Sequence, residues 1–189
     1  MEPEQIFFRF NPWWQEEYKF PGIIREKYLS LLIKEAEGKN VTFITGLRRV
    51  GKTTLVKQLV HKLIEKGIDK KHILFLSLDH SGIAQNSILE LVEKYRQLFG
   101  ISFKEKIYLF FDEIQSIDKF EVDIKTLHDN ENVKIFASGS NSLVLKDKGA
   151  YLTGRNRNIV VNPLSFEEYL LFKGINNNRA EPQLIHHHF

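Results

Sequence analysis

The sequence predicts an α/β fold, a three-layer sandwich around a mostly parallel sheet of five strands. Five short β-rich runs alternate along the chain with longer stretches of helical periodicity. Several of these runs are apolar throughout, which is typical of strands that helices cover on both faces. The five predicted strands span residues 41–45, 73–77, 107–111, 133–138 and 158–161.

Helices are predicted around and between these strands. Apolar residues recur at helical spacing over residues 55–64, and Gly67 then offers a C-terminal stop. Ser87 with Glu90 forms a capping-box pattern ahead of another helix, and Ser165 with Glu168 repeats it. Two further helices are expected: one holds Tyr28, Leu31 and Leu32, and a shorter one holds Phe120, Ile124 and Leu127 with Asp118 as its cap.

Composition narrows the class of protein. The chain has 189 residues, enough for one domain with a sizeable core, and 42% of them are hydrophobic. It contains no cysteine, which excludes disulfides, thiolate zinc sites, iron–sulfur ligation and a cysteine nucleophile. The net charge of +3 is too small to indicate nucleic-acid binding. The acidic N-terminus is unlike a signal peptide and no apolar run approaches the ~18 residues of a membrane span, so a cytoplasmic protein without a membrane partner is expected.

A complete phosphate-binding motif follows the first predicted strand. Residues 46–54 fit the pattern G-x-x-x-x-G-K-[ST] between a strand and a helix, which predicts a P-loop NTPase sandwich. Its glycines let backbone N–H groups turn toward phosphate oxygens, and the helix N-terminus adds a favourable dipole. Lys52 can reach the β- and γ-phosphates, and Thr53 can hold Mg²⁺ through its hydroxyl. Nucleotide binding is assigned to Gly46, Leu47, Arg48, Arg49, Val50, Gly51, Lys52, Thr53 and Thr54, with no catalytic role for either arginine.

A pair of carboxylates ends the third predicted strand. The apolar residues 107–111 deliver Asp112 and Glu113 to the carboxyl edge of the sheet, which is a Walker B pattern. Asp112 is expected to bind Mg²⁺, directly or through water, and Glu113 to orient and deprotonate the attacking water. A GTPase is expected to show D-x-x-G here and N-K-x-D elsewhere, whereas this chain has D-E-I-Q at residues 112–115 and no N-K-x-D. A kinase of small molecules does not need a water-activating glutamate. The pair therefore favours hydrolysis of ATP.

Two further places are candidates for the same site. Asn141, with Ser138 and Ser140, follows the fourth predicted strand, where a hydroxyl or amide can hydrogen-bond the γ-phosphate. The alternative there is an ordinary turn with a helix cap. Arg155 precedes the fifth predicted strand and can stabilise charge on the transferred phosphoryl group, from its own subunit or a neighbour. The alternative is an arginine on the surface.

The N-terminal region offers apolar side chains for recognition or packing. Ile23 or Ile24, ahead of the first predicted helix, can pack on adenine. The aromatic pair Trp13 and Trp14 fits a core or an interface better than a base-stacking platform, because no basic groove pattern accompanies it. If the pair were exposed on the surface, this would be one reason to expect DNA binding.

The ordered set of motifs resembles the AAA-type ATPases of archaea and bacteria, near the STAND branch. The resemblance rests on the phosphate loop and on residues 76–79, 111–115, 138–142, 152–155 and 163–169. It implies a five-stranded core with an extra strand between the phosphate-loop strand and the Walker B strand. It also implies Glu113 as catalytic base, a sensor among residues 138–141, and Arg155 in place of the family's finger-like arginine. The predicted catalytic set is Glu113, Lys52, Arg155 and Asn141.

These motifs predict a core that binds ATP and Mg²⁺ and hydrolyses the nucleotide slowly, which switches a conformation or an assembly. The expected division is an N-terminal extension over residues 1–20, the ATPase core over 21–173, and a linker or truncated C-terminal region over 174–189. Relatives of this kind continue into further regions, so a DNA or protein partner is expected to bind outside this chain, and a homo-oligomer is a further expectation. Two alternatives stay open: an ATP-dependent DNA- or protein-binding module with negligible turnover, and a P-loop phosphotransferase.

Overall fold

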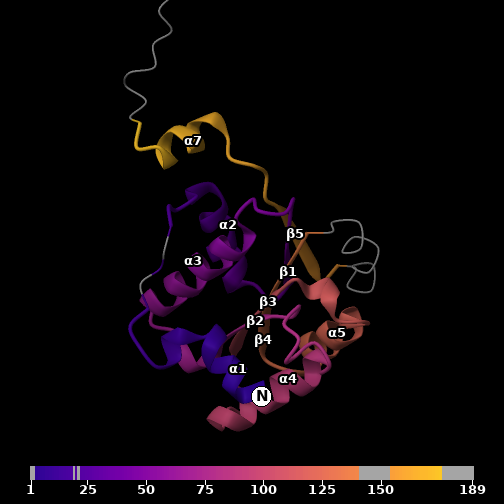
Figure 1. The fold of residues 1–189 in the computed structure, drawn as a ribbon. Coiled ribbons are helices and arrows are strands. Elements are labelled where there is room, and N and C mark those ends of the chain that lie inside the picture. The colour runs from indigo at the N-terminus through magenta and orange to yellow at the C-terminus, as the bar shows by residue number, and fades with distance from the viewer. Residues whose placement is uncertain (1–2, 19, 21, 141–153, 176–189) are drawn as a thin grey trace, which may run out of the picture.

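The computed structural model describes residues 3–18, 20, 22–140 and 154–175, and a parallel five-stranded sheet lies at its centre (Figure 1). The strands are β1 (Val41–Thr45), β2 (Ile73–Ser77), β3 (Ile107–Asp112), β4 (Val133–Gly139) and β5 (Asn156–Val160). Their order across the sheet is β2-β3-β4-β1-β5, and all four neighbouring pairs are parallel. The extra strand that the resemblance implies is β4, which lies between β1 and β3. The predicted α/β fold is confirmed.

Helices cover both faces of the sheet and complete the three layers. They are α1 (Pro3–Phe10), α2 (Glu26–Glu37), α3 (Lys52–Glu65), α4 (Ile88–Phe99), α5 (Phe120–Asn130) and α7 (Phe166–Phe172). α2 and α3 pack together on one face, and α4 and α5 pack together on the other (Figure 1). Right-handed crossovers require this split, because the chain crosses the sheet in one direction from β1 to β2 and returns in the other from β2 through β3 to β4. Within the described ranges, every helix is too short or too polar to span a bilayer.

The predicted helix starts are confirmed at two helices and wrong at a third. The hydroxyls of Ser87 and Ser165 each accept a hydrogen bond from the backbone N–H three residues on. The glutamate at that position accepts one from the N–H of the serine, so both capping boxes form. Asp118 does not cap α5. The chain enters this helix through Lys119 at φ 56°, in the left-handed region, and the helix starts at Phe120.

The N-terminal residues cover the edge of the sheet that β2 forms. The side-chain amide of the buried Asn11 donates to the Phe75 carbonyl (2.9 Å) and accepts from the Phe75 N–H (2.7 Å). The indole N–H of Trp14 donates to the Ile73 carbonyl (3.0 Å). These bonds satisfy backbone groups that an open edge would expose. Trp13 and Trp14 are only 2% and 6% exposed, so their interpretation as core residues is confirmed and neither offers a stacking surface.

β4 carries a lysine that is fully buried. The ammonium of Lys134 donates to the hydroxyl of Thr42 (3.0 Å) and to the Asn40 carbonyl, near the amino edge of the sheet. Burial lowers the pKa of Lys134 from its ordinary 10.5 to about 8, since the protein interior disfavours the charged form.

Stability is expected to rise with pH above the folded-state pKa of Lys134. Between pH values of about 8 and 10.5 the unfolded chain holds a proton that the folded chain has released, so raising the pH favours the folded state. We expect the free energy of unfolding in urea to increase from about pH 7.5 to about pH 9.5 relative to that of Lys134→Met, which lacks the group. Parallel pH profiles for the two proteins would contradict a depressed lysine pKa.

Candidate nucleotide-binding site

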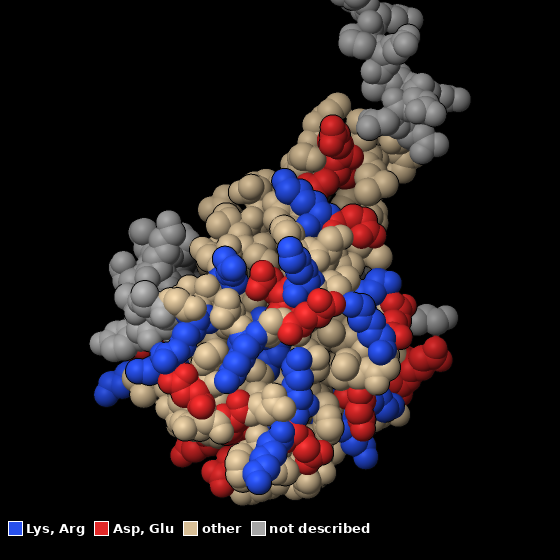
Figure 2. All heavy atoms as spheres, turned by 180° about the vertical axis from the view of Figure 1, so that it is seen from behind, with Lys and Arg blue, Asp and Glu red and all other residues tan. Residues whose placement is uncertain are grey.

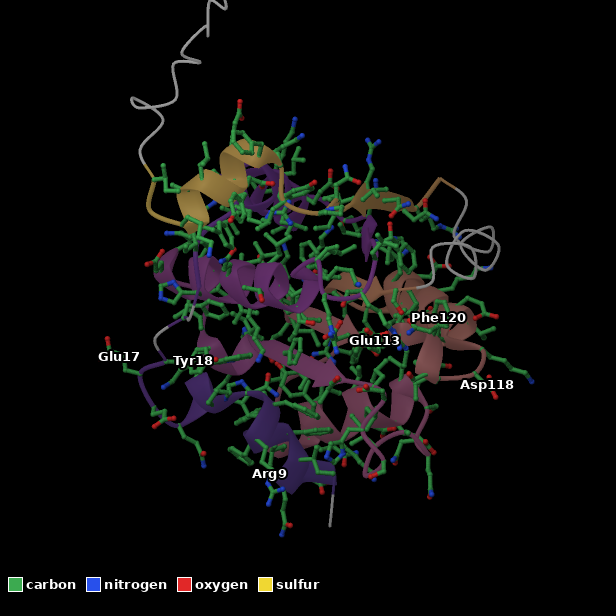
Figure 3. The ribbon with its side chains drawn as sticks, turned by 45° about the horizontal axis from the view of Figure 1, so that its top comes forward. Arg9, Glu17, Tyr18, Glu113, Asp118 and Phe120 are labelled. Atoms are coloured by element: carbon green, nitrogen blue, oxygen red, sulfur yellow. The ribbon has the colours of Figure 1, made fainter. Side chains whose placement is uncertain are left out.

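The candidate site lies at the carboxyl edge of the sheet, where β1, β3 and β4 end side by side. The register places Thr45 beside Gly139 and Phe111 beside Ala137. The loop after β1 and the carboxylates after β3 therefore converge, as parallel sheets arrange their ligand sites. Glu113 lies near the middle of the molecule, whereas Asp118 lies at its periphery (Figure 3). The loop and Glu113 border a cavity of about 680 Å³, whose lining also includes Asp79, Gln115 and Ser116.

Two glycines shape the phosphate loop. Gly46 and Gly51 have φ angles of +150° and +94°, which L-residues with a side chain rarely adopt. A Cβ atom on Gly46 would lie 2.3 Å from the carbonyl oxygen of Val161, the residue after β5. Since α3 begins at Lys52, the unpaired amides of its first turn belong to the same loop and can face an anion. The glycine conformations and the helix start that a phosphate loop needs are thus present in residues 46–54, and phosphate binding there stays a prediction.

Replacing Gly46 with Ala is expected to lower the free energy of unfolding by about 3 kcal/mol, because backbone strain adds to the overlap with Val161. Gly100→Ala is the matched control. Gly100 has a φ of +66°, but a Cβ there meets no atom within 4 Å, so only the strain of about 1 kcal/mol is expected. Urea denaturation of both variants measures the difference. Equal losses would show that Val161 does not restrict position 46.

Lys52 is buried, and none of the described carboxylates pairs with it. It is 5% exposed, and its ammonium donates to the carbonyls of Gly46 and Leu47, both at 3.0 Å. Across the described part of the chain, no ion pair involves this lysine. A buried cation is stable when an anion compensates it, and a nucleotide phosphate would supply that charge.

Thr53 and Asp112 bring together the oxygen atoms that suit a magnesium ion. The Thr53 hydroxyl donates to one carboxylate oxygen of Asp112 at 2.6 Å, and the buried Ser138 hydroxyl donates to the other. Mg²⁺ takes hard oxygen ligands and usually keeps several waters and substrate phosphates beside one or two protein groups. The hydroxyl and the carboxylate therefore fit the predicted metal-binding role of these two residues.

Glu113 lines the cavity from a strained backbone position. Its φ of 51° lies in the left-handed region, which costs a residue with a side chain about 1–3 kcal/mol and is most often found at functional sites. The Gln115 side-chain amide donates to the Glu113 carboxylate, and the Ser140 hydroxyl lies 3.5 Å from the same oxygen. The sequence indicated no role for Gln115. Its only signal was its position two residues after the predicted base.

The other predicted site residues are placed differently. Ile23 borders a second cavity of about 290 Å³ beside the phosphate loop, whereas Ile24 borders a neighbouring one of about 370 Å³. Asn141 lies outside the described residues. The structure does not bring Arg155 to the site. The Arg155 carbonyl accepts from the N–H of Val41 (2.8 Å), which places it at the amino edge of the sheet, opposite the phosphate loop.

The guanidinium of Arg155 lies 3.6 Å from the Asp129 carboxylate, at this same amino edge. We therefore correct the prediction that Arg155 acts directly in the site of its own subunit. Arg155 precedes β5 at the amino edge of the sheet, whereas Lys52 and Glu113 follow strands at the carboxyl edge, so the full length of a strand separates them. A role in a neighbouring subunit stays a prediction.

Fold and site together define the class: a P-loop NTPase with an ATPase-like nucleotide-binding core. The phosphate loop follows β1, the acidic pair follows β3, and β4 lies between these two strands. The chain belongs to the AAA domain family, whose family model matches residues 38–170. The closer placement near the STAND branch stays a prediction.

Three curated relatives cover most of this chain, and all are described as uncharacterized. MJ1637 of Methanocaldococcus jannaschii is 32% identical over 167 residues, which are 87% of this chain and 34% of that protein. A protein of Haemophilus influenzae is 32% identical over 159 residues, 82% of this chain and 39% of its own length. MJ1544 of M. jannaschii is 33% identical over 137 residues, 72% of this chain and 29% of that protein. The chain thus spans about a third of the length of these relatives.

A solved structure shares the fold. The structure of C. elegans PCH-2 matches with a TM-score of 0.53 at 17% sequence identity, over 83% of this chain and 47% of that one. At this identity the likeness concerns the arrangement of sheet and helices alone.

Proposed function

We propose that this chain binds ATP with Mg²⁺ and hydrolyses it through a water molecule that Glu113 activates. The observation that carries the proposal is the 2.6 Å contact between Thr53 and Asp112. It joins two motifs that lie 59 residues apart in the sequence and sets them on one cavity, together with Lys52 and Glu113. This combination is what hydrolysis of a nucleoside triphosphate needs: a phosphate cradle, metal ligands and a base.

Each side chain has a defined task in this proposal. Lys52 and the first amides of α3 hold the phosphates and offset their charge. Thr53 and Asp112 would hold Mg²⁺, which neutralises charge on the phosphate oxygens. Glu113 accepts a proton from the attacking water, and the Gln115 amide fixes the direction of the Glu113 carboxylate.

Ser138 is the sensor candidate that the geometry favours. Its hydroxyl contacts the Asp112 carboxylate, so a change at Asp112 reaches β4 directly. Ser140 touches the carboxylate of Glu113 instead. A shift of either contact on loss of the γ-phosphate would move the end of β4, and this is the conformational switch that we propose.

The test is phosphate release from ATP by the purified chain, with and without Mg²⁺. We expect release that requires the metal and that an excess of chelator stops. Nucleotide binding without any release would favour the binding module instead. Transfer of phosphate to a small-molecule acceptor would favour a phosphotransferase.

The structure offers little support for DNA binding by the described residues. Trp13 and Trp14 are buried, which removes one reason to expect DNA binding. On the face that Figure 2 shows, Lys and Arg side chains intermix with Asp and Glu over the described residues. A DNA or protein partner is proposed instead for the regions that the longer relatives have beyond the matched third of their length.

A further inference from the structure

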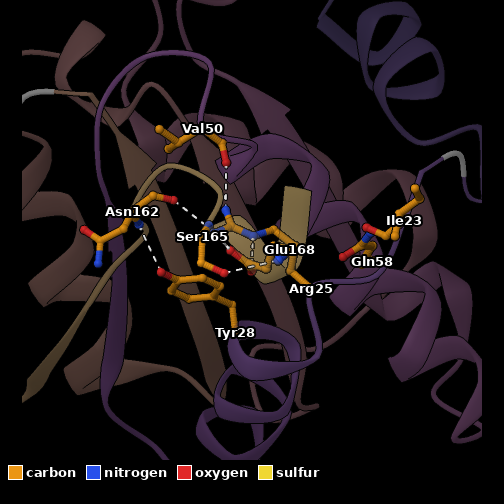
Figure 4. A network of polar contacts seen from close by, with 8 residues as sticks. All are labelled: Ile23, Arg25, Tyr28, Val50, Gln58, Asn162, Ser165 and Glu168. Atoms are coloured by element: carbon orange, nitrogen blue, oxygen red, sulfur yellow. Dashed lines mark hydrogen bonds and ion pairs between the residues drawn. The ribbon is translucent and has the colours of Figure 1, made fainter. Parts of the chain in front are cut away.

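Arg25 is a buried arginine that joins three separate segments of the chain (Figure 4). One terminal nitrogen donates to the Val50 carbonyl in the phosphate loop (3.0 Å). The other donates to the Asn162 carbonyl, after β5 (3.0 Å). Two parallel bonds of 2.8 and 2.9 Å reach the Glu168 carboxylate on α7. Such bidentate, charge-assisted pairs are strong and geometrically specific.

Neighbouring residues reinforce these contacts. The Arg25 guanidinium lies 4.5 Å from the centre of the Tyr28 ring, and the Tyr28 hydroxyl accepts the N–H of Asn162 (3.1 Å). The hydrogen bond from Arg25 holds the pKa of Glu168 below its usual range, which favours the charged carboxylate. Arg25 at the N-cap of α2 therefore binds both the segment after β5 and α7, and Tyr28 in the first turn adds a contact to the former.

The segments that Arg25 binds are those that would surround a nucleotide. In a trans peptide the C=O and the following N–H point in opposite directions, so the bond to Val50 fixes the direction of the Gly51 N–H. Leu164 and Phe172, on either side of Glu168, line the 290 Å³ cavity together with Ile23. Val50, Gly51 and Thr54 of the phosphate loop and α3 border this same cavity, so it adjoins the place proposed for the phosphates.

We propose that Arg25 is a positioning residue for the nucleoside part of the nucleotide: through Glu168 and Val50 it holds α7 beside the phosphate loop and so forms the apolar cavity that takes the base. The inference rests on the proposed function, because it assumes that the phosphates bind the loop. Arg25 itself borders this cavity, but its polar groups are directed at the protein rather than at a ligand. Four of its five N–H donor positions are already directed at protein oxygens.

The chain contains a matched control pair. Arg96 on α4 binds the Glu131 carboxylate at 2.8 Å and the Ser102 carbonyl at 2.6 Å. Its side chain and that of Glu131 are 9% and 22% exposed, against 4% and 22% for Arg25 and Glu168. Glu131 precedes β4, at the amino edge of the sheet and away from the loop. Loss of either carboxylate thus leaves a similar buried arginine without its partner.

The experiment compares Glu168→Gln with Glu131→Gln in the 189-residue chain. Glutamine keeps the size of the side chain and can replace the glutamate of a capping box. Dissociation constants are measured for Mg-ATP and for inorganic triphosphate with Mg²⁺, and urea denaturation gives the stability of each variant. We expect Glu168→Gln to weaken ATP binding about tenfold and to leave triphosphate binding within about twofold. Glu131→Gln is expected to lose similar stability and to change neither dissociation constant.

A second variant, Arg25→Lys, keeps the charge but cannot reach all four oxygens, and it should lower the preference for ATP over triphosphate as well. The same preference in wild type, Glu168→Gln and Glu131→Gln would overturn the inference while leaving the proposed function intact. So would wild-type protein that binds triphosphate as tightly as ATP. Wild-type protein that binds neither ligand would overturn the proposed function and the inference with it.

Discussion

Lys52→Ala is expected to abolish nucleotide binding, with the dissociation constant for Mg-ATP rising about 100-fold or more, which corresponds to about 3 kcal/mol. Lys52 is buried and lines the 680 Å³ cavity, and the described ion pairs do not include it. Its attraction for the phosphates is therefore only weakly screened by water, and none of the described carboxylates shares it. Titration with ATP, followed by calorimetry or a fluorescent analogue, measures the loss.

The same substitution is expected to leave the fold at least as stable as before. Removal of Lys52 deletes a buried charge that has no carboxylate partner among the residues the structure describes, so its desolvation cost disappears. Lys66→Ala, at the exposed C-terminal end of the same helix, is the control and should alter neither binding nor stability. If Lys52→Ala binds ATP within about twofold of wild type, the assignment of the phosphate loop fails.

Glu113→Gln is expected to keep nucleotide binding and to reduce phosphate release about 100-fold or more, because an amide cannot accept the proton of the attacking water. Glutamine has nearly the same shape, so the strained turn at φ 51° and the loop around it should persist. Separate measurements of the dissociation constant and of steady-state phosphate release distinguish these effects. The matched variant is Glu93→Gln, on the exposed side of α4, which should release phosphate at the wild-type rate. Undiminished release by Glu113→Gln would move the role of base to another group.

Local patterns were sufficient to predict the strands and the phosphate loop. The five predicted strands match β1 to β5 within two residues at each end. For β1 to β4 the reason is that buried parallel strands need mainly apolar runs of this length, whereas β5 is largely exposed. The motif around Gly46 and Lys52 was predictable because its glycine conformations and its helix start are set by neighbouring residues. Asp112 and Glu113 were predictable because they directly follow such an apolar strand.

Other features depend on contacts between residues far apart in the chain. Arg155 lies near a glycine turn and a strand, and sequence cannot say which edge of the sheet holds the start of that strand. Pairing of β5 with β1 decides it, and Arg155 falls at the edge away from the phosphates. The burial of Trp14 depends in the same way on a distant residue, since its indole N–H donates to the carbonyl of Ile73, 59 residues along the chain. The Arg25 contacts to Val50, Asn162 and Glu168 span 25, 137 and 143 residues.

The sequence by itself determined the fold class, the phosphate loop and the acidic pair. The loop and the pair follow from spacing and side-chain chemistry within about ten residues, and the fold class follows from the order of such local patterns along the chain. Only the tertiary structure decided which of the candidate site residues lie in contact with one another. It brought Thr53 to Asp112, joined Arg25 to Glu168, and separated Arg155 from the candidate nucleotide-binding site in its own chain. The physical reason is that hydrogen bonds and ion pairs act over a few ångströms in space, and sheet order and crossover direction set those distances independently of sequence separation.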